Sequence, residues 1–470
     1  QMDANRRWLK VFVALGCLVG SLLACYNPTP TAEPGSSPAP EPTETPEQAV
    51  ASPIPEEPTS APSPAAEDAT LAPEPIVSPE VEGFVIAYTK GGSLWLSEDG
   101  AAPRQLTSGG LDGRPILSPD GQWVVFEREA GVGAMGLPRF DLWVVGVDGS
   151  DLHRLVAVAD LPGETVTASD SDDEILLDRV PMQVAWLPGS NALAFNTQLM
   201  VEHGMAPKDD LWRVGVDSQG LTQVLPDGQG GVFAFSPDGA HLAVSTPSEV
   251  SMMNADGGNR RALVDFDFVD TASEYAFYPM PAWAPDGSSA LVAISSPEPF
   301  SDAIPTADVW RLPVDGAALQ LATLSGTFLF SAMGDSLWSA DRTRVGYTVA
   351  AEVWSNERTL VISDLDGGHA TEYATGDLEF VGWADQGEYF AFRDRSSGQF
   401  FLGRVGQAAN PLVQGGGSEQ VVSLEWVGAD TVVYTAAAQG TFTLWRQRIG
   451  EEPYLVDTTG GTIPTIDVLP

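Results

Sequence analysis

The side chains best suited to hold a transition metal are the four histidines, His153, His203, His241 and His369. They are widely separated, and no two of them have the H-x-x-x-H or His/Cys spacing that would bring two ligands to one ion. Structural zinc sites need four ligands, and catalytic sites need at least three. The sequence therefore predicts no transition-metal site and no cofactor, and it assigns these histidines mainly structural roles.

The densest acidic cluster contains Asp170, Asp172, Asp173 and Glu174. Calcium takes six to eight oxygen ligands, and this cluster could supply several of them. The run lacks the glycine and the distal glutamate of an EF-hand loop. A solvated loop is the favoured interpretation, and a calcium site at these four residues is the weaker alternative.

Carboxylates are also the groups available for acid–base catalysis. Hydrolysis of a glycosidic bond needs two of them at a defined separation, and the sequence gives no means of pairing them. The Gly-x-Ser-x-Gly nucleophile motif of α/β-hydrolases does not occur. We therefore expect a non-enzymatic binding or scaffold protein, with a carboxylate-based glycan hydrolase or lyase as the alternative.

The composition excludes one class of partner. The 470 residues include 64 acidic and 23 basic ones, which gives a formal net charge of −41. A surface this acidic repels phosphate backbones, so nucleic acid is not an expected partner. Hydrophobic residues make up 43% of the chain, which is enough for a sizeable core, and two cysteines cannot form a disulfide scaffold.

The N-terminus has the layout of a secretion signal. Three basic residues precede an apolar run over 11–23, which ends in the letters LLAC at Cys25. This run is shorter than the ~20 residues that a membrane-spanning helix needs. The ending resembles the lipobox of bacterial lipoproteins. The resemblance implies that 1–24 is a signal peptide and that Cys25 carries lipid, which would place the protein in the cell envelope or at the cell surface. An ordinary signal peptide or an uncleaved anchor is the alternative.

The segment after the cysteine cannot form a core. Residues 27–82 contain 15 prolines and 11 acids, with no lysine, arginine or aromatic residue. Proline and like charges favour an extended chain. We predict that 25–82 is a disordered stalk that holds a domain away from the membrane, or else a linker whose length has no function.

The rest of the chain, 83–470, is one repeat. Ser-Pro-Asp-Gly, or a weaker version of it, adjoins an apolar anchor at positions 117, 186, 235, 283, 338, 383 and 426, which are 43 to 69 residues apart. Pro, Asp and Gly each favour a tight turn at this point. Each unit contains four strand-like pieces, and short strands at such a period are typical of propeller blades.

The two ends of this region complete one another. The first unit, over 85–106, lacks its first strand, and the last residues, 465–470, match the first strands of other units at 114–119 and 182–188. The sequence therefore predicts an all-β, eight-bladed propeller of four-stranded antiparallel blades, which the C-terminal strand closes. Seven blades are the alternative.

These units resemble the repeats of the TolB-like β-propeller family, which is related to WD repeats, over about 83–470. Relatives in that family include periplasmic scaffolds and the propeller gates of prolyl-oligopeptidase-like enzymes. The resemblance implies the fold rather than a function. The sequence also departs from TolB, because the predicted anchor and stalk stand in place of the TolB N-terminal domain.

Ten tryptophans recur once per unit, five at the anchors and five in the third strands, and this recurrence predicts packing between blades. The anchor set is Trp186, Trp283, Trp338, Trp383 and Trp426, and the third-strand set is Trp95, Trp143, Trp212, Trp310 and Trp445.

The connections differ between the two faces of the predicted ring. Those after the second and fourth strands emerge on one face, and many of them are long, at about 129–140, 159–181, 200–209, 266–278, 297–307, 325–333 and 352–358. Long loops on a rigid scaffold are where binding usually resides. The candidate contacts for a protein, peptide or glycan partner are Phe266, Phe268, Tyr275, Phe277 and Tyr278 in one loop, and His203 and Lys208 in another. Packing of these loops on themselves is the alternative.

Overall fold

The structure is a computed structural model, and it describes residues 83–98, 101–167, 174–201, 206–217, 220–302, 304–326, 328–329, 334, 336–350, 355–415 and 419–469. The predicted signal peptide, Cys25 and the stalk lie outside the described residues, as do Asp170, Asp172, Asp173 and His203. In the part that is described, no helix is both long enough and apolar enough to cross a membrane.

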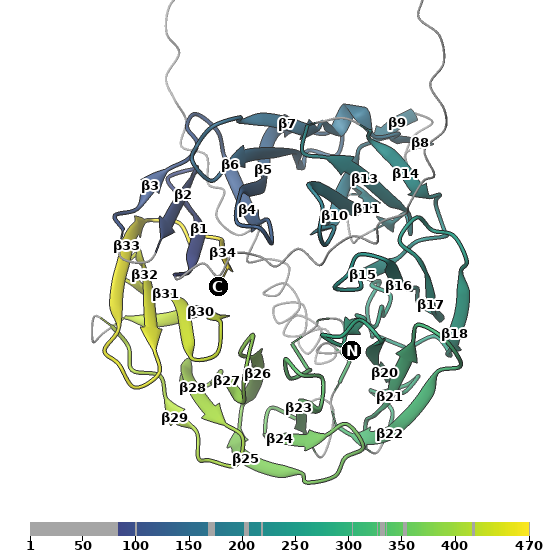
Figure 1. Cartoon of the computed structure of the whole chain (residues 1–470), viewed down its shortest axis with the longest axis vertical. Coiled ribbons are helices and arrows are strands. Elements are labelled where there is room, and N and C mark those ends of the chain that lie inside the picture. The colour runs from purple at the N-terminus through teal and green to yellow at the C-terminus, as the bar shows by residue number, and fades with distance from the viewer. Residues whose placement is uncertain are drawn as a thin grey trace, which may run out of the picture. The chain divides into compact units, whose positions relative to one another are not determined.

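The described chain forms a closed ring of eight antiparallel sheets (Figure 1). We number the sheets as blades 1 to 8 along the chain. Blade 1 contains β34 (Ile466–Leu469), β1 (Val85–Lys90), β2 (Ser93–Glu98) and β3 (Arg104–Gln105); blade 2 contains β4 (Asp112–Leu117), β5 (Trp123–Val132), β6 (Pro138–Gly146) and β7 (His153–Val156). Blade 3 contains β10 (Arg179–Trp186), β11 (Ala192–Leu199), β12 (Ala206–Pro207), β13 (Leu211–Gly215) and β14 (Thr222–Leu225); blade 4 contains β15 (Val232–Phe235), β16 (His241–Ser245), β17 (Glu249–Asn254) and β18 (Arg261–Asp265).

The second half of the ring repeats the pattern. Blade 5 contains β19 (Ala282–Trp283), β20 (Ser289–Ser295), β21 (Thr306–Pro313) and β22 (Leu319–Ser325); blade 6 contains β23 (Arg344–Val349), β24 (Arg358–Asp364) and β25 (Thr371–Gly376). Blade 7 contains β26 (Leu378–Trp383), β27 (Tyr389–Asp394), β28 (Gln399–Arg404) and β29 (Asn410–Pro411); blade 8 contains β30 (Gln420–Val427), β31 (Thr431–Ala438), β32 (Thr441–Arg448) and β33 (Tyr454–Gly460). A 3-10 turn (Val158–Asp160) and the hairpin of β8 (Glu164–Thr167) and β9 (Glu174–Leu177) connect blades 2 and 3.

The prediction of eight four-stranded blades is confirmed, and the seven-bladed alternative is wrong. Two blades depart from the regular pattern. Blade 3 carries β12 as an additional short strand. In blade 6 the first strand is reduced to a single bridge between Trp338 and Val345 among the described residues.

The C-terminal strand closes the ring as predicted. β34 pairs with β1 over Val85 to Tyr88, and the Thr89 amide continues the pairing by donating to the Thr465 carbonyl at 3.0 Å. On its other side, the Asp467 carboxylate accepts a hydrogen bond from the Leu117 amide of blade 2 at 2.6 Å. The last strand of the chain, β34, therefore serves as the first strand of blade 1 and also bonds to blade 2.

The Ser-Pro-Asp-Gly segments are turn elements, as predicted. Asp120 accepts hydrogen bonds from the Ser118 hydroxyl at 2.6 Å and from the Gln122 amide at 3.1 Å. Gly121 has a φ of 65°, which favours glycine. The aspartate therefore holds the first turn of its blade.

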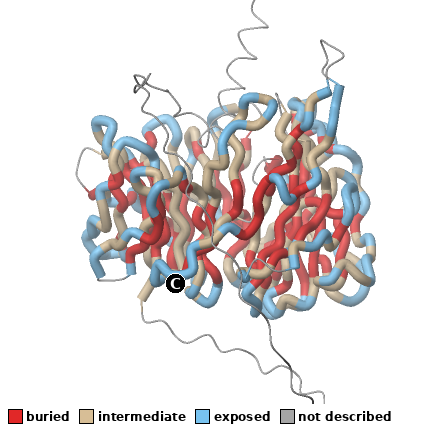
Figure 2. Tube along the Cα trace, turned by 90° about the horizontal axis from the view of Figure 1, so that it is seen from above, coloured by how far each residue is buried: buried red, intermediate tan, exposed pale blue. Residues whose placement is uncertain are grey.

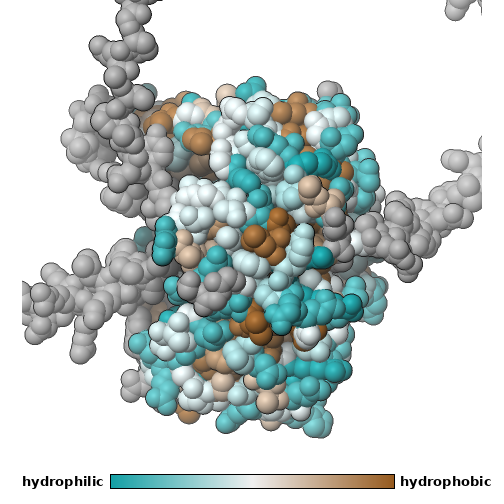
Figure 3. Space-filling view, turned by 90° about the vertical axis from the view of Figure 1, so that its left-hand side faces the viewer, coloured by the Kyte–Doolittle hydropathy of each residue, from teal (hydrophilic) through white to brown (hydrophobic). Residues whose placement is uncertain are grey.

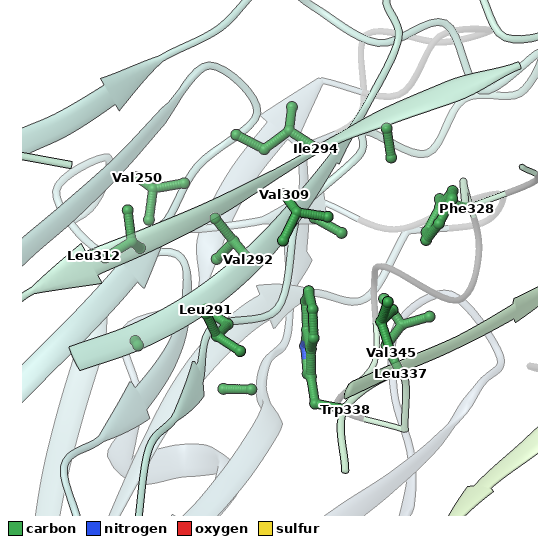
Figure 4. Close-up of a cluster of buried hydrophobic side chains, with 14 of the residues drawn as sticks. Val250, Leu291, Val292, Ile294, Val309, Leu312, Phe328, Leu337, Trp338 and Val345 are labelled. Carbon is green, nitrogen blue, oxygen red and sulfur yellow. The ribbon is translucent and has the colours of Figure 1, made fainter. Parts of the chain in front are cut away.

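The anchor tryptophans are buried between blades, which confirms the packing prediction for that set. The Trp283 indole N–H donates to the Ala234 carbonyl of the preceding blade at 2.9 Å, and Trp383 does the same to Leu337 at 2.9 Å. Trp338 is 2% exposed and packs with Val345 among the side chains of Figure 4. In the third-strand set, Trp212 is buried and the other four tryptophans are partly buried.

Candidate functional site

The connections after the second and fourth strands share one face of the ring, because consecutive strands of each blade run antiparallel. We call this the long-loop face. Buried strands run between it and the opposite face, and exposed connections lie at both ends (Figure 2). One predicted loop, 129–140, is mostly strand, since β5 extends to Val132 and β6 begins at Pro138.

The aromatic loop 266–278 folds back onto the ring. Phe277 is fully buried and lies edge-to-face with Phe266 at a centroid distance of 6.4 Å. Tyr278 is 8% exposed, whereas Phe268 is 62% exposed. The expectation that these side chains are exposed is wrong for Phe277 and Tyr278. Phe277 packs in the hydrophobic core between blades 4 and 5, and Tyr278 is buried with its hydroxyl bonded to Asp209. Tyr275 and Phe266 are partly buried, which leaves Phe268 as the exposed aromatic side chain of the loop.

This loop is held by its backbone. The Phe266 amide donates to the Ser248 carbonyl at 2.9 Å, and the Asp270 amide donates to the Pro297 carbonyl at 2.8 Å. These two bonds join the loop to the connections after the second strands of blades 4 and 5. Phe268 therefore projects from a segment that is fixed on both sides, which lowers the entropy cost of using it as a contact.

Lys208 lies in an ion-pair network instead of facing solvent alone. Its ammonium pairs with Glu164 and, at 3.4 Å, with Asp227. Asp227 also binds Arg179 at 2.8 Å, and the buried Arg179 pairs with the fully buried Asp210 at 3.2 Å. The hydrogen bond and charge of Glu164 raise the pKa of Lys208. The network ties the hairpin between blades 2 and 3 to blade 3, so we interpret Lys208 as structural.

Tyr278 forms a second contact between loops of the long-loop face. Its hydroxyl donates to Asp209 at 2.9 Å, and Asp209 holds a φ of 46°. Burial raises the pKa of Asp209, while the hydrogen bond from Tyr278 opposes that shift. The contact fixes the blade 3 loop against the aromatic loop, although the two lie about 70 positions apart in the chain.

Glu174, the described member of the predicted calcium cluster, is exposed at the start of β9. Within the described ranges, no three His, Cys, Asp or Glu side chains are grouped as a metal site would require. His153 and His241 begin β7 and β16, and the exposed His369 pairs with Asp364 at 2.6 Å.

A cavity of about 490 Å³ opens beside the aromatic loop, between blades 4 and 5. Binding sites for small ligands have volumes of this order. We call it the blade 4–5 groove. Its lining is Val264, Asp265, Phe266, Asp267, Ile294, Ser295, Ser296, Pro297, Thr306, Asp308 and Trp310. Of these residues, the sequence predicts only Phe266 as a contact, because a groove between two blades has no local sequence pattern.

A second feature, which the sequence pattern did not predict, is a pair of acids on the inner strands of blades 8 and 1. Burial raises the pKa of Glu425 to about 8, and the negative charges of Asp467 and Asp385 add to that shift. Burial raises the pKa of Asp467 to about 6, and its bond from the Leu117 amide opposes the shift. Neighbouring acids with raised pKa values are typical of functional sites, although structural pairs show them too.

A signal for this acidic pair was present in the repeat. The residue before each anchor is apolar or small in blades 2 to 7 and acidic in blades 8 and 1. These residues are Ile116, Ala185, Ala234, Ala282, Leu337, Gly382, Glu425 and Asp467. The two acidic positions become neighbours because the C-terminal strand closes the ring next to blade 8.

The chain matches no protein-family model and no curated protein sequence. Similar solved structures include the β-propeller domain of the Trilobed protease from Pyrococcus furiosus, with 10% identity, a TM-score of 0.43, and coverage of 75% of this chain and 99% of that one. TolB from Acinetobacter baumannii shows 12% identity, a TM-score of 0.30 and coverage of 61% and 62%. Prolyl oligopeptidase B from Galerina marginata shows 10% identity, a TM-score of 0.46 and coverage of 75% and 51%. At this level of similarity the propeller assignment depends on the strand pairing of the chain itself.

Proposed function

We propose that this protein is a lipid-anchored, extracytoplasmic β-propeller that binds a protein or peptide partner on its long-loop face without catalysing a reaction. The observation that supports this most is the exposed Phe268, held on a fixed loop beside the blade 4–5 groove. Exposed aromatic side chains next to a cavity are typical contact points in interfaces. The acidic surface disfavours nucleic acid as the partner.

The outer rim provides less support for a partner. The side drawn in Figure 3 is mainly hydrophilic, with separated hydrophobic spots. The exposed Leu319 and Tyr454 lie on the outer strands of different blades. A structural role in an envelope assembly would require a broad apolar patch, so we place binding on the long-loop face.

The anchor is tested by Cys25→Ala. Because Cys25 is the lipid attachment site in this proposal, the variant is expected to leave an unprocessed precursor or to release the protein from membranes. Stable attachment of a protein needs two or more acyl chains, which this residue would provide. Membrane fractionation with a mobility assay for processing gives the result, and normal processing with unchanged membrane association would refute the proposed anchor.

The binding face is tested by Phe268→Ala. We expect at least a tenfold loss of partner retention from a cell-envelope extract, since truncating an aromatic contact of this kind costs about 2 kcal/mol or more. The thermal midpoint should not change, because the side chain is exposed. The matched control is Tyr454→Ala, which removes an aromatic of similar exposure from the rim strand β33. Equal retention by both variants would move the site away from the aromatic loop.

A carboxylate-based glycan hydrolase or lyase is the second candidate, and one observation favours it. Glu425 and Asp467 are neighbouring acids, and Glu425 has a pKa of about 8, which suits a general acid at neutral pH. Release of reducing ends from a polysaccharide by the wild-type chain, lost in Glu425→Gln, would favour this candidate over the binding protein.

A further inference from the structure

The third-strand tryptophans of blades 1 and 2 each have a cation of this chain against the ring. The Lys90 ammonium lies 4.8 Å from the Trp95 centroid, and the Arg128 guanidinium lies 4.7 Å from the Trp143 centroid. In each blade the tryptophan is paired with a residue of the second strand, Tyr88 or Phe126, and the cation comes two positions after that residue. Carboxylates of the chain fix both cations, at 2.7 Å and 2.6 Å (Asp457 and Asp112).

In blades 2 and 3 the aspartate that precedes such a tryptophan by two residues is paired with an arginine, which comes from the fourth strand in blade 2 and from the first strand in blade 3. In blade 2, Asp141 pairs with Arg154 at 3.3 Å. In blade 3, Asp210 pairs with Arg179 at 3.2 Å. In both blades, the aspartate of the Asp-x-Trp unit is therefore paired with an arginine of the same chain.

Blade 5 has the third Asp-x-Trp unit, Asp308 and Trp310. It has no cation at the two positions that Arg128 and Arg154 occupy in blade 2. The position of Arg128 is occupied by Ile294, and the position of Arg154, opposite the tryptophan, is occupied by Gln320. Asp308 accepts a hydrogen bond from the Thr323 hydroxyl at 2.5 Å. No lysine or arginine of the described residues lies within ion-pair distance of it.

The blade 4–5 groove opens at this unit, and Ile294, which holds the position of Arg128, is part of its lining. Asp308 and Trp310 line it, together with Asp265 and Asp267 from the end of β18 and the start of the aromatic loop. None of the three carboxylates forms an ion pair with another described residue. The Ser296 hydroxyl, which also lines the groove, is buried and has no hydrogen-bond partner in the described part of the chain. The groove thus combines three negative charges, an aromatic ring and an unused hydroxyl.

We infer that the blade 4–5 groove binds a lysine or arginine side chain of a partner peptide, in the place that the chain's own cations occupy beside the third-strand tryptophans of blades 1 and 2. A guanidinium or ammonium can pair with Asp308 and lie against Trp310, as Arg128 does against Trp143. Phe266 and Pro297 offer apolar contact to the flanking residues of the peptide. This inference rests on the proposed function and specifies its ligand.

The test uses the full chain in detergent and three capped tripeptides, acetyl-Ala-Arg-Ala-amide and its Gln and Glu counterparts, titrated by ligand-observed NMR. We expect the Arg peptide to bind roughly tenfold or more tightly than the Gln peptide, since a charge-assisted bond contributes about that much, and the Glu peptide not to bind. Affinity for the Arg peptide should also fall as salt is added. Equal affinity for the Arg and Gln peptides would overturn the inference.

Two substitutions separate the groove from non-specific attraction to an acidic protein. Asp308→Asn should weaken the Arg peptide roughly tenfold. Gln320→Arg restores a cation where blade 2 has Arg154, and it should compete with the peptide while the fold stays intact, because Gln320 is exposed. Asp315→Asn is the matched control, since this exposed acid lies in the same blade after β21, on the opposite face.

The outcomes are distinguishable from those for the proposed function. Unchanged Arg-peptide affinity in Gln320→Arg overturns the inference, as does an equal loss in Asp315→Asn and Asp308→Asn. Either result leaves Phe268-dependent partner retention standing. Loss of partner retention in Gln320→Arg, with the thermal midpoint unchanged, would show that the partner itself supplies the cation.

Discussion

Deletion of residues 463–470 is expected to lower the thermal midpoint of the propeller by about 5 °C or more, or to abolish cooperative unfolding. The deletion removes β34, whose apolar side chains Ile466, Val468 and Leu469 pack against blades 1, 2 and 8. Partial burial of three such side chains contributes on the order of 4 kcal/mol. The deletion also leaves the inner edge of β1 unpaired, and an open sheet edge promotes aggregation.

A length-preserving variant separates packing from ring closure. Ile466→Ala with Val468→Ala keeps the backbone pairing with β1, so we expect a smaller loss than in the deletion. Differential scanning calorimetry measures both. A deletion variant with the wild-type midpoint would show that the ring does not depend on its C-terminal strand.

Glu425→Gln is expected to stabilise the protein at pH 8.5 and to leave its stability nearly unchanged at pH 4. Burial raises the pKa of Glu425 from 4.5 to about 8, with the charges of Asp467 and Asp385 contributing. Glutamine has a similar shape and carries no charge to bury. At about 1.4 kcal/mol per pKa unit, the gain in the free energy of unfolding above pH 8 is on the order of 5 kcal/mol.

The sign of this effect follows from proton binding. Between pH 4.5 and 8 the unfolded chain has released the proton of Glu425, while the native protein retains it. The native state therefore binds more protons, and its stability falls as the pH rises through this window. Below pH 4.5 both states are protonated, so the native glutamic acid carries no penalty there.

The matched control for this prediction is Glu452→Gln, which removes one negative charge at an exposed position. It accounts for the general effect of net charge on a strongly acidic protein. Chemical denaturation of the wild type and both variants at pH 4, 6 and 8.5 gives the free energies of unfolding. Equal gains in the two variants at pH 8.5 would show that Glu425 is not penalised by burial.

The architecture of this protein could be predicted from its sequence because a propeller blade is built from contacts that are close in the chain. The strand, the Ser-Pro-Asp-Gly turn and the next strand lie within about 20 residues, and each repeat states the same pattern again. The match between 465–470 and the first strands of other units predicted the closing strand correctly. Seven copies of one signal compensate for the weakness of any single copy.

The location of the candidate site was decided by tertiary structure. Phe277 and Phe268 stand nine positions apart in one loop, yet one is in the core and the other is in solvent, because only Phe277 meets the hydrophobic cluster of blades 4 and 5. Lys208 is likewise paired with Glu164, 44 positions earlier in the chain. The sequence shows that such residues are aromatic or charged, but it does not show which neighbours bury or neutralise them in the folded protein.

The acidic pair and the groove show most clearly which features the sequence determines and which depend on the tertiary structure. By itself, the sequence determined the ring of eight blades, the turn chemistry and the absence of local catalytic motifs. Ring closure made neighbours of Glu425 and Asp467, 42 positions apart, and the space between blades 4 and 5 put Asp308 beside Asp265 and Asp267. Burial and charge coupling depend on distances in space, and those distances are set only when every blade has packed against the next.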